Sequence, residues 1–245
     1  MRVLVVLPTY QEADNIAIVL RRLRADGGGV DVLVVDDASP DGTAEKAERL
    51  AAELGHVEVL RRSGKLGLGS AYRLGFAWGL EHGYDVLMEM DADLSHDPAA
   101  VPSLVAAVAQ GADAAIGSRY VPGGSIPDWS WHRRLLSRWG NVYAARMLRL
   151  PVHDATSGFR AYRAPVLAAM DLDAVRADGY GFQIEMTMRA DRAGARFHEV
   201  PISFTDRTVG TSKMSSRIIV EALALVTLWG VRDRLVALRR AVRRR

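Results

Sequence analysis

The sequence predicts an α/β fold in which a mostly parallel sheet carries helices on both faces and is followed by a C-terminal amphipathic helix. Short apolar runs rich in β-branched residues alternate with helix-length segments of mixed polarity through the first half of the chain. This alternation is the pattern of parallel strands that are joined by crossover helices. The chain has 245 residues and is 49% hydrophobic, so it can bury one full core.

The predicted strands are the apolar runs that stop at proline, aspartate or glycine, which are residues that break strands. Apolar positions recur at helical spacing from about Trp131 to Leu148. Residues 154–160 are expected to form a loop, a further helix begins near Gly179, and Glu199–Phe204 forms a late strand. The five earlier strands are expected at Val3–Leu7, Val30–Val35, Val57–Leu60, Val86–Met90 and Ala114–Ile116.

The most informative stretch is Met88–Pro98, where an apolar strand runs into two carboxylates, Asp91 and Asp93. Side chains two residues apart on a strand project the same way, so both carboxylates can point into one crevice. Such a pair suits a hard divalent cation that bridges a diphosphate. The alternative is a turn whose aspartates are solvated or cap the helix that starts after Asp97.

Polar loops follow the first four predicted strands, and the carboxyl ends of parallel strands share the edge of the sheet where ligands bind. The first two loops, Pro8–Asn15 and Asp36–Thr43, offer carboxylates that accept hydrogen bonds from base N–H groups or ribose hydroxyls. The third loop, Ser63–Gly69, is glycine-rich, but its spacing matches neither the dinucleotide-binding fingerprint nor the P-loop. Binding of NAD or ATP through those motifs is therefore not expected.

The C-terminal part of the chain has a composition of its own. The run Ile218–Val231 is almost wholly apolar, and the last fourteen residues contain seven arginines against one aspartate, although the net charge of the chain is only +3. A membrane span needs about 20 apolar residues, so we expect a helix packed on the core, an interfacial helix whose basic tail binds anionic lipid, or both at once. Nucleic-acid binding is not expected, because no aromatic and basic sheet motif accompanies the tail.

The cysteine content and the N-terminal segment give information on the cellular compartment of the protein. The chain contains no cysteine, which excludes disulfides and thiolate metal sites and agrees with a reducing cytoplasm. The N-terminal apolar run is only as long as a strand and ends at Pro8, so it does not predict a signal peptide. A cytoplasmic protein is therefore expected.

The motifs of these loops, with others in the second half of the chain, resemble those of the inverting glycosyltransferases of family two, which have a GT-A (Rossmann-like) fold. The resemblance is greatest to dolichol-phosphate (polyprenol-phosphate) mannose synthases and extends over residues 3–214. Some relatives continue into transmembrane helices and this chain does not, which leaves membrane attachment to the basic tail or to a membrane partner protein. The matching motifs are PTYQEADN, DDASPDGT, GKLGLGSAY, DADLSHDP, GSRY, TSGFRAY, GYGFQIE and EVPISFTDRTVGTSKM.

The resemblance implies a nucleotide-sugar site at the edge of the sheet. Asp91 and Asp93 would hold Mg²⁺ or Mn²⁺, with a third contact at Ser95, where relatives often have glutamine. Asp36 is expected to be structural, because strand alternation turns it away from the cleft, and His96 is expected to support its loop rather than act as a ligand or a base. The implied donor-binding residues are Pro8, Tyr10, Glu12, Val35, Asp37, Lys65, Asp91 and Ala92.

The implied acceptor is a polyprenyl phosphate, which is already anionic at neutral pH because the second pKa of a phosphate monoester is about 6. No strong general base is then required, but cations must compensate the charge of the attacking phosphate. Arginine forks match phosphate oxygens. The resemblance implies acceptor-phosphate contacts from Arg119, Arg133, Ser137, Arg207 and Lys213, and catalytic roles for Asp93, Arg119, Arg207 and Lys213.

These inferences predict a GT-A catalytic domain over residues 1–215, followed by a C-terminal helix and basic tail over residues 216–245. The expected reaction transfers mannose from GDP-mannose to a polyprenyl phosphate, and inversion of the α-linked donor gives a β-linked product. The protein is expected to bind peripherally to the cytoplasmic face of a membrane. Two alternatives remain open: the same fold acting on UDP-glucose, and a non-catalytic nucleotide-sugar-binding protein.

Overall fold

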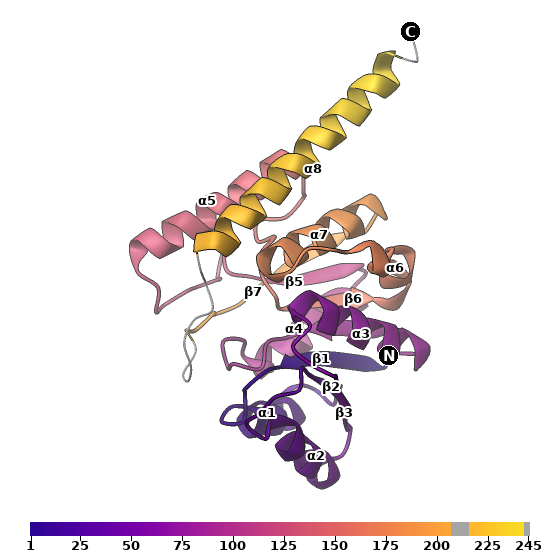
Figure 1. Ribbon diagram of the computed structural model, residues 1–245, viewed down its shortest axis with the longest axis vertical. Coiled ribbons are helices and arrows are strands. Elements are labelled where there is room, and N and C mark those ends of the chain that lie inside the picture. Colours follow the sequence, from indigo (N-terminus) through magenta and orange to yellow (C-terminus); the bar gives the residue numbers. More distant parts are fainter. Residues whose placement is uncertain (207–215, 243–245) are drawn as a thin grey trace.

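A seven-stranded sheet forms the centre of the computed structural model, which describes residues 1–206 and 216–242 (Figure 1). The strands are β1 (Val3–Thr9), β2 (Asp31–Asp36), β3 (Val57–Arg61), β4 (Val86–Glu89), β5 (Ala114–Ser118), β6 (Arg160–Arg163) and β7 (Phe197–Pro201). Their order in this part of the chain is β3-β2-β1-β4-β6-β5-β7. Neighbouring strands run parallel except at β6, which lies antiparallel between β4 and β5.

Helices cover both faces of this sheet, as the alternation of strands and helices predicts. The described α-helices are α1 (Ile16–Asp26), α2 (Thr43–Leu54), α3 (Leu68–Glu81), α4 (Val101–Ala109), α5 (Trp131–Leu148), α6 (Ala164–Ala169), α7 (Gly179–Arg192) and α8 (Ser216–Val242). Short 3-10 turns lie at Pro98–Ala100 and Leu172–Ala174.

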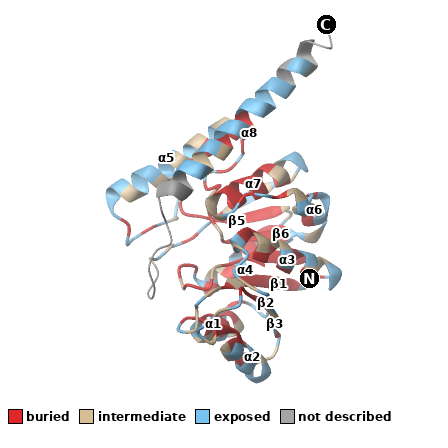
Figure 2. Cartoon of the chain, viewed as in Figure 1, coloured by how far each residue is buried: buried red, intermediate tan, exposed pale blue. Residues whose placement is uncertain are grey.

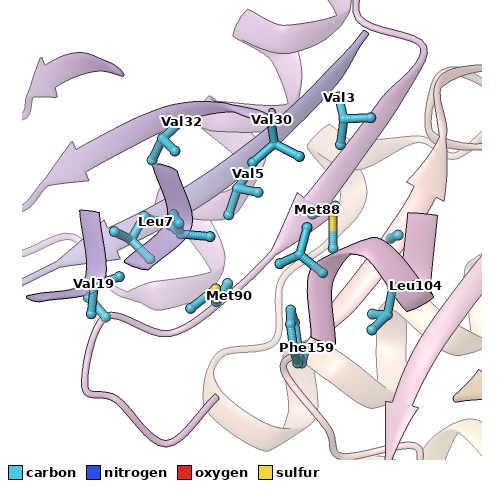
Figure 3. Close-up of a cluster of buried hydrophobic side chains, with 14 of the residues drawn as sticks. Val3, Val5, Leu7, Val19, Val30, Val32, Met88, Met90, Leu104 and Phe159 are labelled. Carbon is cyan, nitrogen blue, oxygen red and sulfur yellow. The ribbon is translucent and has the colours of Figure 1, made fainter. Parts of the chain in front are cut away.

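Alternate residues of the central strands enter two different hydrophobic cores, because successive side chains on a strand point to opposite faces. On one face Val5 of β1 packs with residues of α1, α2 and α4, and Figure 3 shows part of this cluster, including Val5, Met88 and Leu104. On the other face Leu4 packs with residues of α3, α6 and α7. Burial on both faces explains why these strands are near-continuous apolar runs.

A third hydrophobic cluster lies where α5 and α8 cover the end of the sheet that contains β5 and β7. Ala144 of α5, Ile116 of β5, Ile184 of α7 and Val226 of α8 are buried in it. α8 runs beside α5 and then extends past the rest of the molecule, where its surface is largely exposed (Figures 1 and 2). Within residues 1–206 and 216–242, no helix has the length and hydropathy that crossing a membrane requires.

The five strands expected in the first half of the chain are present within two residues of their expected bounds, and α5 spans the expected residues. The late strand is shifted, because β7 begins at Phe197 and ends at Pro201, opposite Ser118 at the end of β5. The sequence does not indicate β6, which begins inside the segment expected to be a loop. Its four residues include two arginines, Arg160 and Arg163, and so give no apolar strand signal.

Gly75 of α3 tests how tightly this helix packs on the sheet, and Gly140 of α5 serves as the comparison. A Cβ at Gly75 of α3 would overlap the side chain of Val6, whereas a Cβ at Gly140 of α5 meets nothing within 4 Å. Gly75→Ala should therefore destabilise the protein by about 1–3 kcal/mol through overpacking, while Gly140→Ala should stabilise it by roughly 0.5–1 kcal/mol through helix propensity. Urea unfolding measures both changes, and a Gly75→Ala variant as stable as the wild type would contradict this close packing.

Candidate active site

A cavity of ≈ 530 Å³ lies at the carboxyl edge of the sheet, where the loops after β1, β2, β3 and β4 meet. Residues after β5, before and at the start of α5, from segment 156–158, at the start of α7 and after β7 complete its walls. A parallel sheet binds ligands at this edge, and all four loops predicted from the sequence contribute to the cavity. Its lining includes Pro8, Tyr10, Glu12, Asp37, Lys65, Asp91, Ala92, Asp93, Ser95, Arg119 and Arg133.

The acidic loop, residues 91–96, is held by hydrogen bonds within the loop and from α3. Asp93 Oδ1 accepts hydrogen bonds from the backbone N–H of Ser95 (3.0 Å) and from its hydroxyl (2.5 Å). The phenol of Tyr72 donates to Asp91 Oδ1 (3.3 Å). Both carboxylates line the cavity, as the D-x-D spacing predicts. The hydroxyl of Ser95 is a donor to Asp93 and thereby orients this carboxylate.

His96 supports the acidic loop through its backbone. Its ring is buried and stacks on Phe159 with 5.0 Å between centroids, and its Nδ1 accepts a hydrogen bond from the N–H of Asp91 (3.1 Å). Burial lowers the pKa of His96 to about 4, although the nearby charge of Asp93 acts in the opposite direction. The ring is therefore neutral at neutral pH, which an accepting Nδ1 requires. This agrees with the expected supporting role.

The oxygen donors of the acidic loop fit a hard divalent cation. In the part of the chain that the structure describes, no group of three or more His, Cys, Asp or Glu side chains could hold a metal ion. Asp91 and Asp93 would therefore share the ion with oxygens of other origin. Mg²⁺ is commonly bound in this way, by one or two carboxylates together with substrate phosphates and water.

Two adjacent aspartates organise the loops after β1 and β2. Asp36 is buried and accepts hydrogen bonds from the hydroxyls of Thr9 (2.8 Å) and Ser39 (2.6 Å), which ties the two loops together. Its structural role agrees with the expectation from strand alternation. Asp37 instead lines the cavity and pairs with Arg62 at 2.5 Å. This pair sets the orientation of the Asp37 carboxylate at the cavity wall.

An aromatic surface lies beside these carboxylates. Lys65 Nζ is 4.1 Å from the centroid of the Tyr10 ring, which is a cation–π contact. Both residues line the cavity together with Glu12. A nucleobase can stack on such a ring while its N–H groups donate to a neighbouring carboxylate.

Three residues in the cavity loops adopt left-handed backbone conformations. They are Gln11 (φ 59°), Ala38 (φ 54°) and Leu94 (φ 65°), and each directly follows a residue that lines the cavity. This conformation costs a residue other than glycine about 1–2 kcal/mol. Three of the five non-glycine residues with positive φ in the described chain therefore lie in loops that present side chains to the cavity.

Arg119 follows β5 and is a buried cation in the cavity wall. Its Nε and Nη2 donate to the two carboxylate oxygens of Asp154 at 2.7 Å each, and Nη2 also donates to Thr156 Oγ1 (2.8 Å). Burial acts to lower the pKa of Arg119, but the Asp154 carboxylate raises it above its ordinary value. The same pairing lowers the pKa of Asp154 despite its own burial. A bidentate pair of this kind fixes the orientation of the guanidinium.

Arg133 lies in the first turn of α5 and is half-buried. Its guanidinium carbon lies 3.9 Å from the ring centroid of Trp129, and its Nη1 pairs with Asp206 at 3.0 Å. The indole N–H of Trp129 also donates to Asp206 (2.7 Å). The cavity is therefore lined by two arginines in different settings, Arg119 locked in the wall and Arg133 nearer to solvent.

A second cavity of ≈ 90 Å³, which we call the interhelical groove, adjoins the main one between α5, α7 and α8. It shares Trp129, Arg133, Thr156 and Tyr180 with the main cavity. Most of the remaining lining is apolar, so the groove continues the polar site into an apolar channel. These remaining residues are Leu136, Ser137, Gly140, Tyr143, Ala144, Ile184, Ala222, Leu223 and Val226.

Two of the expected site residues that the structure describes, Ser137 and Val35, are not in the lining of the main cavity. Ser137 lies in the interhelical groove, where it accepts a hydrogen bond from the hydroxyl of Tyr120 (2.7 Å). Val35 is fully buried in β2 and belongs to the core. Arg207 and Lys213 lie outside the described residues, so their roles stay predictions.

The cavity wall formed by residues 154–158 is fixed by Arg160, the first residue of β6. Its guanidinium is completely buried and donates to the carbonyl oxygens of Ala155 (2.7 Å), Ser157 (2.7 Å) and Gln183 (2.9 Å). Glu89 is also completely buried, and burial raises its pKa to about 7, while the charge of Arg160 favours its ionised form. A buried arginine and a buried carboxyl group whose pKa is raised therefore lie behind the wall.

The sequence assigns no role to Arg62, Asp154 or Tyr180, although Tyr180 lines both cavities and the other two hold Asp37 and Arg119 in place. In the sequence, only proximity to a motif could indicate Arg62 and Asp154. Arg62 precedes the glycine-rich loop, and Asp154 precedes the TSGF segment. The pairings themselves join residues 25 and 35 positions apart, and only the folded sheet brings them together.

The overall fold recurs in solved structures of glycosyltransferases. Glucosyl-3-phosphoglycerate synthase from Mycobacterium tuberculosis, in complex with Mn²⁺, UDP and glucosyl-3-phosphoglycerate, matches with a TM-score of 0.66 at 21% identity, over 92% of this chain and 78% of that one. The mannosyltransferase PcManGT from Pyrobaculum calidifontis, in complex with GDP-Man and Mn²⁺, matches with a TM-score of 0.58 at 17% identity, over 98% and 75%. The chain thus has the GT-A fold of glycosyltransferases.

The sequence comparisons then give the family. The model described as Glycosyl transferase family 2 matches residues 4–170, and the chain belongs to this family. It is 53% identical to the undecaprenyl-phosphate mannosyltransferase of Micrococcus luteus over 98% of both chains. It is 50% identical to the polyprenol monophosphomannose synthase of Mycolicibacterium smegmatis over 99% of this chain and 92% of that one. The expected fold and family are confirmed.

The neutral state of His96 predicts how the metal-free protein responds to acid. Because its pKa is lowered from 6.5 to about 4, the unfolded state takes up a proton at a higher pH than the folded state does. His96 therefore contributes stability that is fully present above pH 6.5 and is lost as the pH falls from 6.5 towards 4. The urea midpoints at about pH 7 and about pH 5 should differ less in His96→Gln than in the wild type.

His132→Gln is the matched control for this experiment, because His132 is exposed on α5. It should keep the pH dependence of the wild type. If His96→Gln also keeps the full dependence, His96 is not the neutral buried group described above.

Proposed function

We propose that this glycosyltransferase transfers mannose from GDP-mannose to a polyprenyl phosphate and inverts the anomeric configuration. The observation that carries the proposal is the lining of one cavity, which combines an acidic pair suited to a metal-bound diphosphate with two arginines suited to a second phosphate. The names of the Micrococcus luteus and Mycolicibacterium smegmatis relatives support a mannosyl group and a polyprenyl phosphate as the reacting partners.

On the donor side, the first two loops would hold the nucleoside and the acidic loop the diphosphate. Asp91 and Asp93 would bind Mg²⁺ or Mn²⁺, which neutralises charge on the leaving diphosphate when it is bound. Tyr10 would stack on the base, and Asp37, oriented by Arg62, would accept hydrogen bonds from base or ribose. The complex of PcManGT with GDP-Man and Mn²⁺ supports both the donor and a divalent metal.

On the acceptor side, the protein would supply positive charge and no proton acceptor. A phosphate monoester is largely dianionic at neutral pH, so its oxygen can attack without a general base. Arg119 is held ready by Asp154, which means that little reorganisation is needed when the phosphate arrives. Arg133 would contact the same phosphate, with Ser137, Arg207 and Lys213 as further proposed contacts.

The choice of donor is tested by comparing radiolabelled GDP-mannose with UDP-glucose in the presence of polyprenyl phosphate and Mg²⁺. We expect transfer of mannose from GDP-mannose and a β-linked product. Exclusive transfer from UDP-glucose would establish the glucosyltransferase alternative, and the anomeric configuration of the product can be read by NMR.

Substitution at the acidic pair separates an enzyme from a non-catalytic nucleotide-sugar-binding protein. Asp93→Asn should lower kcat by roughly 100-fold or more, because a neutral amide is a poorer ligand for a hard cation. The matched control is Asp97→Asn, because Asp97 is an exposed carboxylate that lies four residues after Asp93 and caps the following turn. Unchanged turnover in Asp93→Asn, measured over a titration of Mg²⁺ and Mn²⁺, would remove the acidic pair from the mechanism.

The interhelical groove is proposed to hold the isoprene units next to the acceptor phosphate, since it is apolar and begins at Arg133. Gly140→Leu should place a side chain in open space at this groove. The KM for polyprenyl phosphate should rise roughly tenfold, because the filled groove excludes apolar surface that would otherwise be buried, while the KM for GDP-mannose stays unchanged. Gly140→Ala, which adds only a methyl group, should leave both KM values near those of the wild type.

We also propose that the protein acts as a peripheral protein at the cytoplasmic face of a membrane. A lipid acceptor supports this location, and so does the arginine-rich end of residues 216–245. A membrane partner protein is the alternative means of attachment. Removal of the arginine-rich end should weaken binding in a salt-dependent manner if the tail contributes to it.

A further inference from the structure

The outer side of α5 carries a row of large apolar side chains that face solvent. Trp131, Leu135, Trp139 and Val142 are 71%, 60%, 51% and 39% exposed. At about 100° per residue these four positions fall within about 80° of one another around the helix. The residues that α5 buries, Asn141, Ala144 and Leu148, lie on the opposite side. The exposed row therefore points away from the body of the protein.

α8 repeats this arrangement beside α5. Val220, Leu228, Val231 and Leu235 are 64%, 63%, 43% and 51% exposed, and their spacing also confines them to about 80° of the helix. Val226, which is buried against the same cluster that α5 covers, lies on the opposite side. The helices α5 and α8 lie side by side at one end of the molecule (Figures 1 and 2), and each exposes an apolar row on the side away from its buried residues.

The charges around the α5 row have one sign. The segment 131–148 contains no acidic residue, and Arg134, Arg138 and Arg146 are exposed within about 100° of the centre of the row. Asp233, on the described outer part of α8, pairs with Arg192. Exposed tryptophans flanked by arginines are typical of surfaces that lie at the boundary between lipid headgroups and acyl chains. An anionic headgroup layer complements this charge.

We propose that the two exposed rows on α5 and α8, hereafter the docking face, bind the surface of an anionic lipid bilayer, with Trp131, Leu135 and Trp139 inserted below the headgroups. The position of the interhelical groove supports a bilayer as the occupant, because the groove lies between these two helices and opens into the main cavity. A lipid acceptor could then enter the site without leaving the membrane. This consequence rests on the proposed function, whereas binding of the face to lipid does not.

Vesicle binding tests the docking face directly. Leu135→Glu and Trp139→Glu should each weaken binding to vesicles of phosphatidylcholine and phosphatidylglycerol by about tenfold or more, because a carboxylate replaces an inserted apolar group near anionic headgroups. Ile18→Glu is the matched control: Ile18 is 49% exposed on α1, at the opposite end of the molecule (Figure 1). Its binding should equal that of the wild type. Equal binding by all four proteins, with equal urea midpoints, would overturn the proposal.

A second experiment separates the docking face from catalysis. With a short, water-soluble polyprenyl phosphate, Leu135→Glu should turn over as the wild type does, whereas with a long acceptor embedded in vesicles its rate should fall about tenfold. Failure of the wild type to use either acceptor would reject the proposed function and leave the vesicle-binding result standing. Normal use of the embedded acceptor by Leu135→Glu would overturn the docking face and leave the proposed function standing.

A second copy of the chain could also cover this face, and the oligomeric state decides between the two occupants. Light scattering behind a sizing column should give a monomer for the wild type and for Leu135→Glu. A wild-type dimer that Leu135→Glu converts to a monomer would overturn the assignment to lipid.

Discussion

The buried guanidinium of Arg160 is the interaction on which the shape of the site depends. An arginine taken out of water is tolerated only where its donors are satisfied and its charge is compensated. Its hydrogen bonds to the carbonyls of Ala155 and Ser157 hold the segment that forms one wall of the cavity, and the bond to Gln183 ties this segment to α7. The strand that Arg160 begins also separates β4 from β5. One charged side chain thus holds the wall that faces the acidic loop.

The two described arginines of the cavity differ in how far they are buried and in how firmly their partners hold them. Arg119 is held by two hydrogen bonds to the Asp154 carboxylate, so its orientation is set when the protein folds and does not depend on a ligand. Arg133 rests on Trp129 and is half-buried, so its side chain has more room to adjust than that of Arg119. A preorganised charge stabilises a transition state effectively because it needs no rearrangement during the reaction.

Most of the sheet and the acidic half of the site could be predicted from the sequence, because both depend on local patterns. Apolar runs define β1 to β5, and the rule that strand ends share one edge places Tyr10, Asp37, Lys65 and Asp91 in a common pocket. β6 could not be predicted, since a strand that begins with a buried arginine is stable only in its finished surroundings. For the same reason the partners that orient site residues are legible only in the folded protein, and Ser137 proved to lie in the groove.

The left-handed residues beside the cavity also bear on the evolution of thermal stability in this protein. Together Gln11, Ala38 and Leu94 store roughly 3–6 kcal/mol of backbone strain, which is large beside the 5–15 kcal/mol by which typical domains are stable. Most mutations destabilise a protein, and selection removes only the variants that fall below the stability that function requires, so natural proteins lie just above this threshold. Substitutions that relieve the strain can therefore still raise the stability of this protein. Glycine at these positions would release part of the strain without touching the side chains that line the cavity, although its flexibility in the unfolded chain offsets some of the gain. Substitutions in these three loops therefore offer a heat-adapted relative a way to raise its stability. Fewer stabilising substitutions are available in the core, because it is already close-packed.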